Sequence, residues 1–223
     1  MPVTLAFSDS PLRDPFIPDG ERSVLSVKID DTETSMRGRV EIGGENGEVY
    51  NIFTSTDKEK LELSMHRRTM MTFSIRTIKT IENYTIDSST TVEGDPMIPA
   101  DEIRMLDTTG LVYSLRGYPF TDPRELKITF LTTENDGESD YELGIDLAGR
   151  ERLDVAGRRI ECYRLELSFK MSGVFSVFTR LVPRTKLWYS VESPHYLVRY
   201  EGQNGPPGTP LTVMELIDYS GWN

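Results

Sequence analysis

Alternation of apolar and polar residues dominates this chain and predicts a protein built mainly of β-strands. Leu25, Val27 and Ile29 alternate with polar neighbours, as one half-buried strand of a sheet requires. The same period of two returns in residues 61–65 and in residues 126–130. Turn-forming glycines and prolines separate these segments. We therefore expect a mainly β protein with roughly 10–13 strands.

The strand segments fall into two series. Residues 1–20 are rich in proline and show no sustained period, which predicts an irregular N-terminal arm. Residues 21–95 predict a first meander of six strands, and residues 124–220 predict a second meander that includes a strand over residues 174–182. Since no linker interrupts the pattern, we expect residues 21–223 to form a single β-domain.

One segment between the two meanders has a helical pattern. Residues 99–118 begin with Pro99 and early acidic residues, and their apolar positions recur at three- and four-residue spacing. Gly110 weakens the helix, while Gly117 and Pro119 are typical of a helix end. The pattern predicts a β-protein that wraps round one short helix.

Charge and length restrict the classes of function. The 223 residues include 36 Asp and Glu but only 25 Lys and Arg, which gives a formal net charge of −11. An acidic surface is repelled by phosphate backbones and anionic headgroups, so we expect no nucleic-acid partner. Solubility alone also explains the acidity. The chain is long enough to bury a large core, and no segment has the ~20 apolar residues of a membrane span.

Motifs in the second half resemble the bacterial domain-of-unknown-function family number three-one-zero-eight. The resemblance lies in residues 107–116, in the strand pair of residues 151–165, and in the segment KLWYSVESPHYLV at residues 186–198. It covers roughly residues 100–220 and implies an antiparallel, strongly curved sheet, an incomplete barrel or a sandwich, clasping one helix. This shape is similar to that of periplasmic lipoprotein carriers, which hold acyl chains.

The resemblance and the N-terminal sequence give different expectations for localisation. Family members usually carry an export signal, which implies the periplasm or the cell envelope. The first residues of this chain lack a basic and an apolar leader region, so either a leader has been removed or the protein is cytoplasmic. Cys162 is the only cysteine, which excludes an internal disulfide and fits a reducing compartment without excluding the periplasm.

The residues available for catalysis or metal binding are few. His66 and His195 are the only histidines and are far apart in sequence, and Cys162 lies on a predicted strand. Zinc and iron sites need several such ligands, and a nucleophile needs an adjacent base. We therefore predict no metal, no cofactor and no catalytic residue.

Three residues are candidates for ligand contact. Tyr113 and Arg116 are three residues apart and share one face of the predicted helix. Arg116 is either a clamp to a carboxylate or strand carbonyls, or an anchor for an anionic headgroup. Trp188 is the better candidate than Tyr189 for a pocket wall, since the two point to opposite faces, although core packing also explains it.

The leading hypothesis is a non-enzymatic binding protein. We expect a hydrophobic or amphipathic small molecule, such as a lipid or acyl chain, in the concave face of the curved sheet. The alternative is a structural or assembly module that acts through a sheet edge or an apolar patch. An enzyme without a standard motif is a third hypothesis, and either a monomer or a homodimer fits the sequence.

Overall fold

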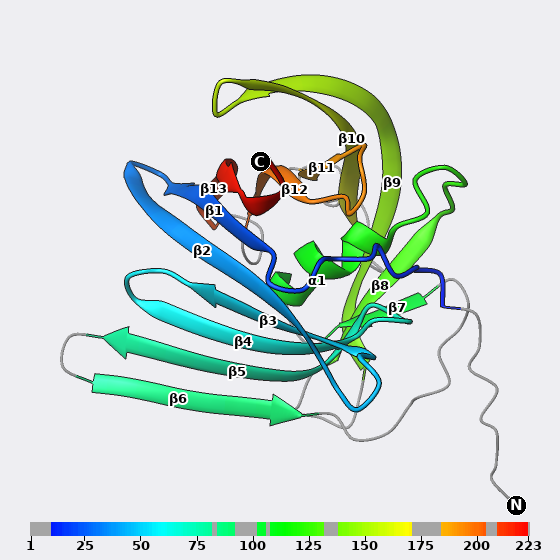
Figure 1. Cartoon of the computed structure of the whole chain (residues 1–223). Coiled ribbons are helices and arrows are strands. Elements are labelled where there is room, and N and C mark those ends of the chain that lie inside the picture. The colour runs from blue at the N-terminus through cyan, green and yellow to red at the C-terminus, as the bar shows by residue number, and fades with distance from the viewer. Residues whose placement is uncertain are drawn as a thin grey trace, which may run out of the picture.

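The computed structural model describes residues 10–81, 84–91, 102–105, 108–131, 138–170, 184–203 and 209–222. A single sheet of 13 strands runs through these residues and curves round one short helix (Figure 1). The strands are β1 (Arg22–Ile29), β2 (Thr32–Gly43), β3 (Val49–Ser55), β4 (Glu59–His66), β5 (Met71–Ile81), β6 (Tyr84–Thr91), β7 (Glu102–Met105), β8 (Leu126–Leu131), β9 (Glu138–Val155), β10 (Arg158–Lys170), β11 (Thr185–Ser190), β12 (Leu197–Gln203) and β13 (Leu211–Tyr219). The helical elements are α1 (Thr108–Ser114) and the 3-10 helices η1 (Leu115–Gly117) and η3 (Ser220–Trp222).

Two meanders meet in the middle of the sheet. The strand order is β6-β5-β4-β3-β2-β1-β13-β12-β11-β10-β9-β8-β7, so the first and last strands of the chain are neighbours. Neighbouring strands are antiparallel except for β7 and β8, which are parallel. The fold class expected from the sequence is confirmed as a strongly curved, mainly antiparallel sheet with one short helix. The strand expected over residues 174–182 lies outside the described residues, as do residues 1–9 of the arm.

Alternating apolar residues line the concave side of the first meander. Val40, Ile52, Leu63 and Ile75 are successive register partners across β2 to β5, and all four are buried. Burial of each such side chain contributes about 1.5–3 kcal/mol as an upper estimate. Because side chains alternate along a strand, a shift of one residue would move the whole row to the outer face.

The N-terminal arm and the helical segment fill the hollow of the sheet. We call residues 10–21 the strap, which crosses over α1 in Figure 1. Leu12 and Ile17 of the strap are only 2% and 1% exposed and pack in one core with Leu115 of η1. Prolines within the strap cannot donate ladder hydrogen bonds, which favours an irregular segment that packs by its side chains.

The prediction of a helix over residues 99–118 is wrong at the N-terminal end of that range. Glu102–Met105 form β7, where Ile103 pairs with Ile128 of β8. The helix begins at Thr108, continues through Gly110, and tightens into η1. Strand pairing at the edge of the sheet outweighs the helical spacing of a short apolar segment, since both patterns fit four residues.

Candidate functional site

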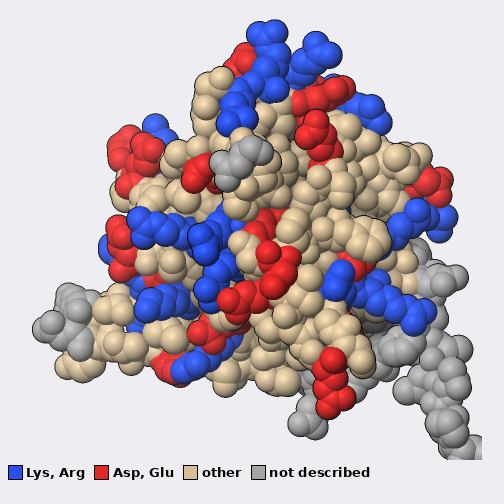
Figure 2. All heavy atoms as spheres, viewed as in Figure 1, with Lys and Arg blue, Asp and Glu red and all other residues tan. Residues whose placement is uncertain are grey.

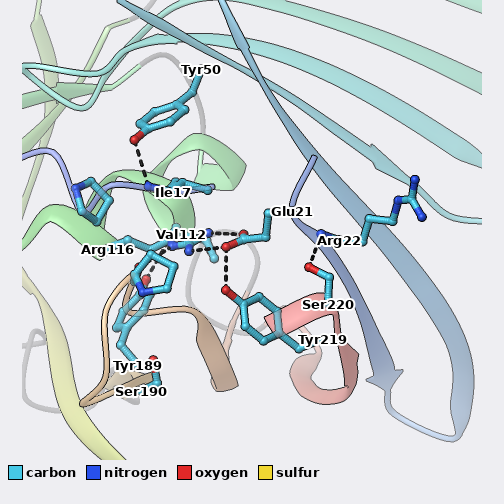
Figure 3. Close-up of polar contacts among 12 residues, drawn as sticks. Ile17, Glu21, Arg22, Tyr50, Val112, Arg116, Tyr189, Ser190, Tyr219 and Ser220 are labelled. Carbon is cyan, nitrogen blue, oxygen red and sulfur yellow. Dashed lines mark hydrogen bonds and ion pairs between the residues drawn. The ribbon is translucent and has the colours of Figure 1, made fainter. Parts of the chain in front are cut away.

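A buried ion pair joins the helical segment to the end of the strap. Arg116 of η1 donates through Nη1 and Nη2 to Glu21 Oε1 and Oε2, at 2.6 and 2.9 Å. The two side chains are only 3% and 4% exposed. In Figure 3, Glu21 lies between Arg116 and Tyr219, whose hydroxyl donates to Oε2 at 2.8 Å. Arg116 Nε also donates to the Pro194 carbonyl at 3.1 Å, so one guanidinium links the helix, the strap and the loop before β12.

The Glu21 carboxylate stabilises the charge of Arg116. Burial opposes the charge of Arg116, but the adjacent Glu21 carboxylate outweighs it and raises the pKa of the guanidinium. Burial, and then the charge of Glu21, raises the pKa of Tyr219 well above its usual range, so its hydroxyl remains a donor. A buried charge is tolerated only when it is paired and hydrogen-bonded, and both conditions are met here.

Two tyrosines hold α1 against the sheet. Tyr113 is 8% exposed, and burial raises its pKa to about 12. It lies against β2, where a Cβ added at Gly38 would be 2.9 Å from the Tyr113 hydroxyl oxygen. From the other meander, Tyr189 of β11 donates its hydroxyl to the Val112 carbonyl at 2.8 Å. The helix is therefore positioned from both halves of the sheet.

Trp188 lies on the opposite face of β11 from Tyr189. Its indole Nε1 donates to Glu151 of β9, and its ring centroid is 5.8 Å from the guanidinium carbon of Arg199. Its register partner on β10 is Arg164. Trp188 is thus packed within a row of charged side chains on the face directed away from the helix, while Tyr189 is the residue that reaches α1.

A second polar cluster holds the middle of the strap. The Tyr50 hydroxyl accepts the backbone N–H of Ile17 at 2.9 Å (Figure 3). The same hydroxyl donates to Asp14 Oδ1. Arg67 donates from Nε to Asp14 Oδ2 at 3.1 Å, and its Nη1 donates to the Gly47 carbonyl at 2.8 Å. Burial, and then the hydrogen bond to Asp14, raises the pKa of Tyr50 well above its usual range. The cluster fixes the strap against the turns at one end of the first meander.

A groove of about 820 Å³ opens beside this cluster. It is bounded by the strap, by the turns that precede β3 and β5, and by the loop after η1. Its lining consists of Ser10, Pro11, Leu12, Arg13, Asp14, Gly47, Glu48, Arg67, Arg68, Pro119 and Arg124. Tyr113, Arg116 and Trp188 are not among these residues, and the structure brings only the first two close together.

Sequence reasoning missed the groove because its residues come from four distant segments. The local signal is the adjacent pair Arg67 and Arg68, but it is not specific, since a second such pair, Arg158 and Arg159, lies outside the groove. Glu21, which pairs with Arg116, was also missed. In Figure 2 basic and acidic side chains are otherwise interleaved over the surface shown, including the strands of the first meander.

Cys162 is buried and His195 is half-buried, whereas His66 at the end of β4 is exposed. Burial raises the pKa of the Cys162 thiol to about 12, so the thiol stays protonated and unreactive at neutral pH. Burial lowers the pKa of His195, whose Nδ1 lies 2.9 Å from the Ser190 carbonyl oxygen. Within the residues that the structure describes, no three His, Cys, Asp or Glu side chains gather as metal ligands.

In the part of the chain that the structure describes, no helix is long and apolar enough to cross a bilayer.

Comparison with known proteins finds similarity to solved structures only. No model of a known protein family matches the sequence, and no curated protein matches it. The chain is similar to a beta-barrel-like protein of the domain of unknown function DUF1849 from Brucella abortus, with a TM-score of 0.46, 8% identity, and coverage of 94% of this chain and 98% of that chain. It is also similar to the hypothetical lipoprotein YmcC from Escherichia coli, with a TM-score of 0.40, 14% identity, and coverage of 91% and 85%.

A third similar structure is the MucA/MucB complex of Pseudomonas aeruginosa, with a TM-score of 0.40 and 11% identity over 94% of this chain. The chain spans about half of that protein, covering 54% of it. These similarities, at low identity and low TM-score, are too distant to carry a functional argument. Function has to be argued from the geometry of this chain.

Proposed function

We propose that the protein is a non-enzymatic binding protein that holds an amphipathic small molecule, such as a lipid or acyl chain, in the groove beside the strap. The observation that carries this proposal is the size and the mixed lining of the groove. Its volume of about 820 Å³ falls within the ~300–1,000 Å³ range of small-molecule sites. Pro11 supplies partly exposed apolar surface, with the buried Leu12 and Pro119 behind it, and arginines supply polar surface beside it.

The two polar clusters hold the strap, which forms one wall of the groove. Because Asp14 is bound in the middle of the strap and Glu21 at its end, this wall is held in place before a ligand arrives. In this proposal Tyr113 and Arg116 act by positioning the strap. Direct ligand contact by Tyr113, Arg116 or Trp188 stays a prediction from the sequence. The family resemblance leads us to propose the cell envelope as the location.

Native mass spectrometry of freshly purified protein, followed by organic extraction, tests this function. We expect an acyl-containing species near one per chain. Replacing Ser10, which lines the groove, by Trp should fill part of it and reduce the bound fraction. The matched control is Thr80→Trp at an exposed position of β5 outside the groove. An unliganded mass for every variant, together with no uptake of added amphiphile, contradicts the proposal.

One observation favours a second function, assembly of two copies through a sheet edge. β6 is the terminal strand of the sheet order and has a strand neighbour on one side only among the described residues. Tyr84 and Ile86 on it are 76% and 51% exposed, and exposed edge strands pair readily with other chains. Light scattering measures the oligomeric state. If the wild-type protein forms a dimer through β6, Ile86→Lys should convert it to a monomer. A wild-type monomer at high concentration rules out edge assembly.

A further inference from the structure

We infer that the ligand carries an anionic headgroup of the phosphate type, which the arginines of the groove bind. This inference rests on the proposed function and names the chemistry of its ligand. Four of the eleven lining residues are arginines, against two carboxylates, in a chain with a net charge of −11. A local excess of positive charge in an acidic protein favours an anionic occupant through electrostatic complementarity.

Both carboxylates of the groove already have partners. Asp14 accepts from Arg67 and from the Tyr50 hydroxyl. Glu48 Oε2 accepts the backbone N–H of Asn46 at 2.8 Å, and hydrogen bonds from backbone amides of its own turn lower the pKa of Glu48. The two carboxylates of the groove are therefore not the partners of Arg13 or Arg124.

Two arginines are available to a ligand. Within the described residues, no ion pair or hydrogen bond is made by the guanidinium of Arg13, which is exposed. Arg124 pairs with Asp122 at 3.0 Å, but these side chains are 61% and 64% exposed. A pair this exposed is weak, so Arg124 can exchange its carboxylate partner for a ligand anion.

The backbone of Arg13 is held firmly although its side chain is free. Its N–H donates to the Gly117 carbonyl at 2.8 Å. A Cβ at Gly117 would lie 2.3 Å from the Arg13 carbonyl oxygen, so the backbones of the strap and η1 are in close contact at this point. A guanidinium on a fixed backbone offers planar, bidentate donors that match phosphate oxygens, at a reduced entropic cost.

The experiment compares three amphiphiles and one free anion by titration calorimetry with the full chain. Dodecyl phosphate, dodecyl maltoside and dodecyl trimethylammonium share one apolar tail, and inorganic phosphate has none. We expect dodecyl phosphate to bind at least ~10-fold more tightly than the other two amphiphiles, and its affinity to fall as salt screens the arginines. Weak binding of inorganic phosphate identifies a lipid-type ligand, whereas equal affinity identifies free phosphate as the source of the anion.

Arginine variants test whether the arginines of the groove bind the headgroup. The double variant Arg13→Gln, Arg124→Gln should lose about 10-fold in affinity for dodecyl phosphate and keep its affinity for dodecyl maltoside. Arg159→Gln is the matched control, since Arg159 is exposed on the β9–β10 hairpin and outside the groove. All substituted side chains are exposed, so folding is retained.

Two outcomes separate the inference from the function on which it rests. Equal affinity for all three amphiphiles, or an unchanged affinity in the double variant, overturns the anionic headgroup while the binding function stands. No binding of any amphiphile overturns both.

Discussion

Removal of one partner of the buried Arg116–Glu21 pair should destabilise the protein strongly. Arg116→Met keeps most of the apolar stem of the side chain but deletes the guanidinium. Glu21 is then left in a site where its side chain is 4% exposed, with the Tyr219 hydroxyl as its remaining side-chain donor. Leaving one buried charge uncompensated costs about 3–5 kcal/mol in free energy of unfolding.

That cost is a large part of the total stability of a domain, which is about 5–15 kcal/mol. For a chain of this length it corresponds to a fall in Tm of about 6–20 °C. Equilibrium urea unfolding, followed by tryptophan fluorescence and by circular dichroism, measures the change and checks that the two probes agree.

A double-mutant cycle isolates the pair itself. Glu21→Gln alone leaves Arg116 without its counter-charge and should also be destabilising. In the double variant no unpaired charge remains, so its cost should be smaller than the sum of the single costs by about 2–3 kcal/mol. Additive costs, or a single-variant cost below about 1 kcal/mol, would refute the view that this pair holds the strap.

Three further predictions follow from the strap and the core. Asp14→Asn removes a partly buried charge and should cost about 1–2 kcal/mol in denaturant unfolding, whereas Asp122→Asn, 64% exposed, should cost less than about 0.5 kcal/mol. The Cys162 thiol, with its pKa raised to about 12 by burial, should resist a thiol reagent at pH 8 until denaturant is added; rapid labelling of folded protein contradicts this. Gly117→Ala places a Cβ 2.3 Å from the Arg13 carbonyl oxygen and should lower stability by about 1–3 kcal/mol, with an unchanged urea midpoint as the contrary result.

Local patterns in the sequence were sufficient to predict most of the strands. The period of two in Leu61, Leu63 and Met65 predicts which face is buried, because burial depends on alternation along one strand. It failed at residues 102–105, where four residues are too few to separate a strand from a helix. Treating residues 21–223 as a single domain stays a prediction.

The candidate site could not be predicted in the same way. Arg116 was identified from the sequence, but its partner Glu21 is 95 residues away, and no local pattern marks such a pair. Choosing between Trp188 and Tyr189 required knowing which face of β11 is concave, which depends on the β-bulge between them and the curvature of the whole sheet. Such residues come together only in the tertiary structure, so no local sequence pattern identifies them.

The pairing of β1 with β13 has a consequence for the synthesis of the protein. Ser23 pairs with Tyr219, so the contact that joins the two meanders waits until β13, far along the chain from β1, has left the ribosome. Until then β1 is an unprotected edge, with alternating apolar residues that favour pairing with other chains. Contacts of such long sequence separation also slow folding. The nascent chain is therefore expected to need a chaperone during this interval, and a circular permutant with β13 fused before β1 should fold faster.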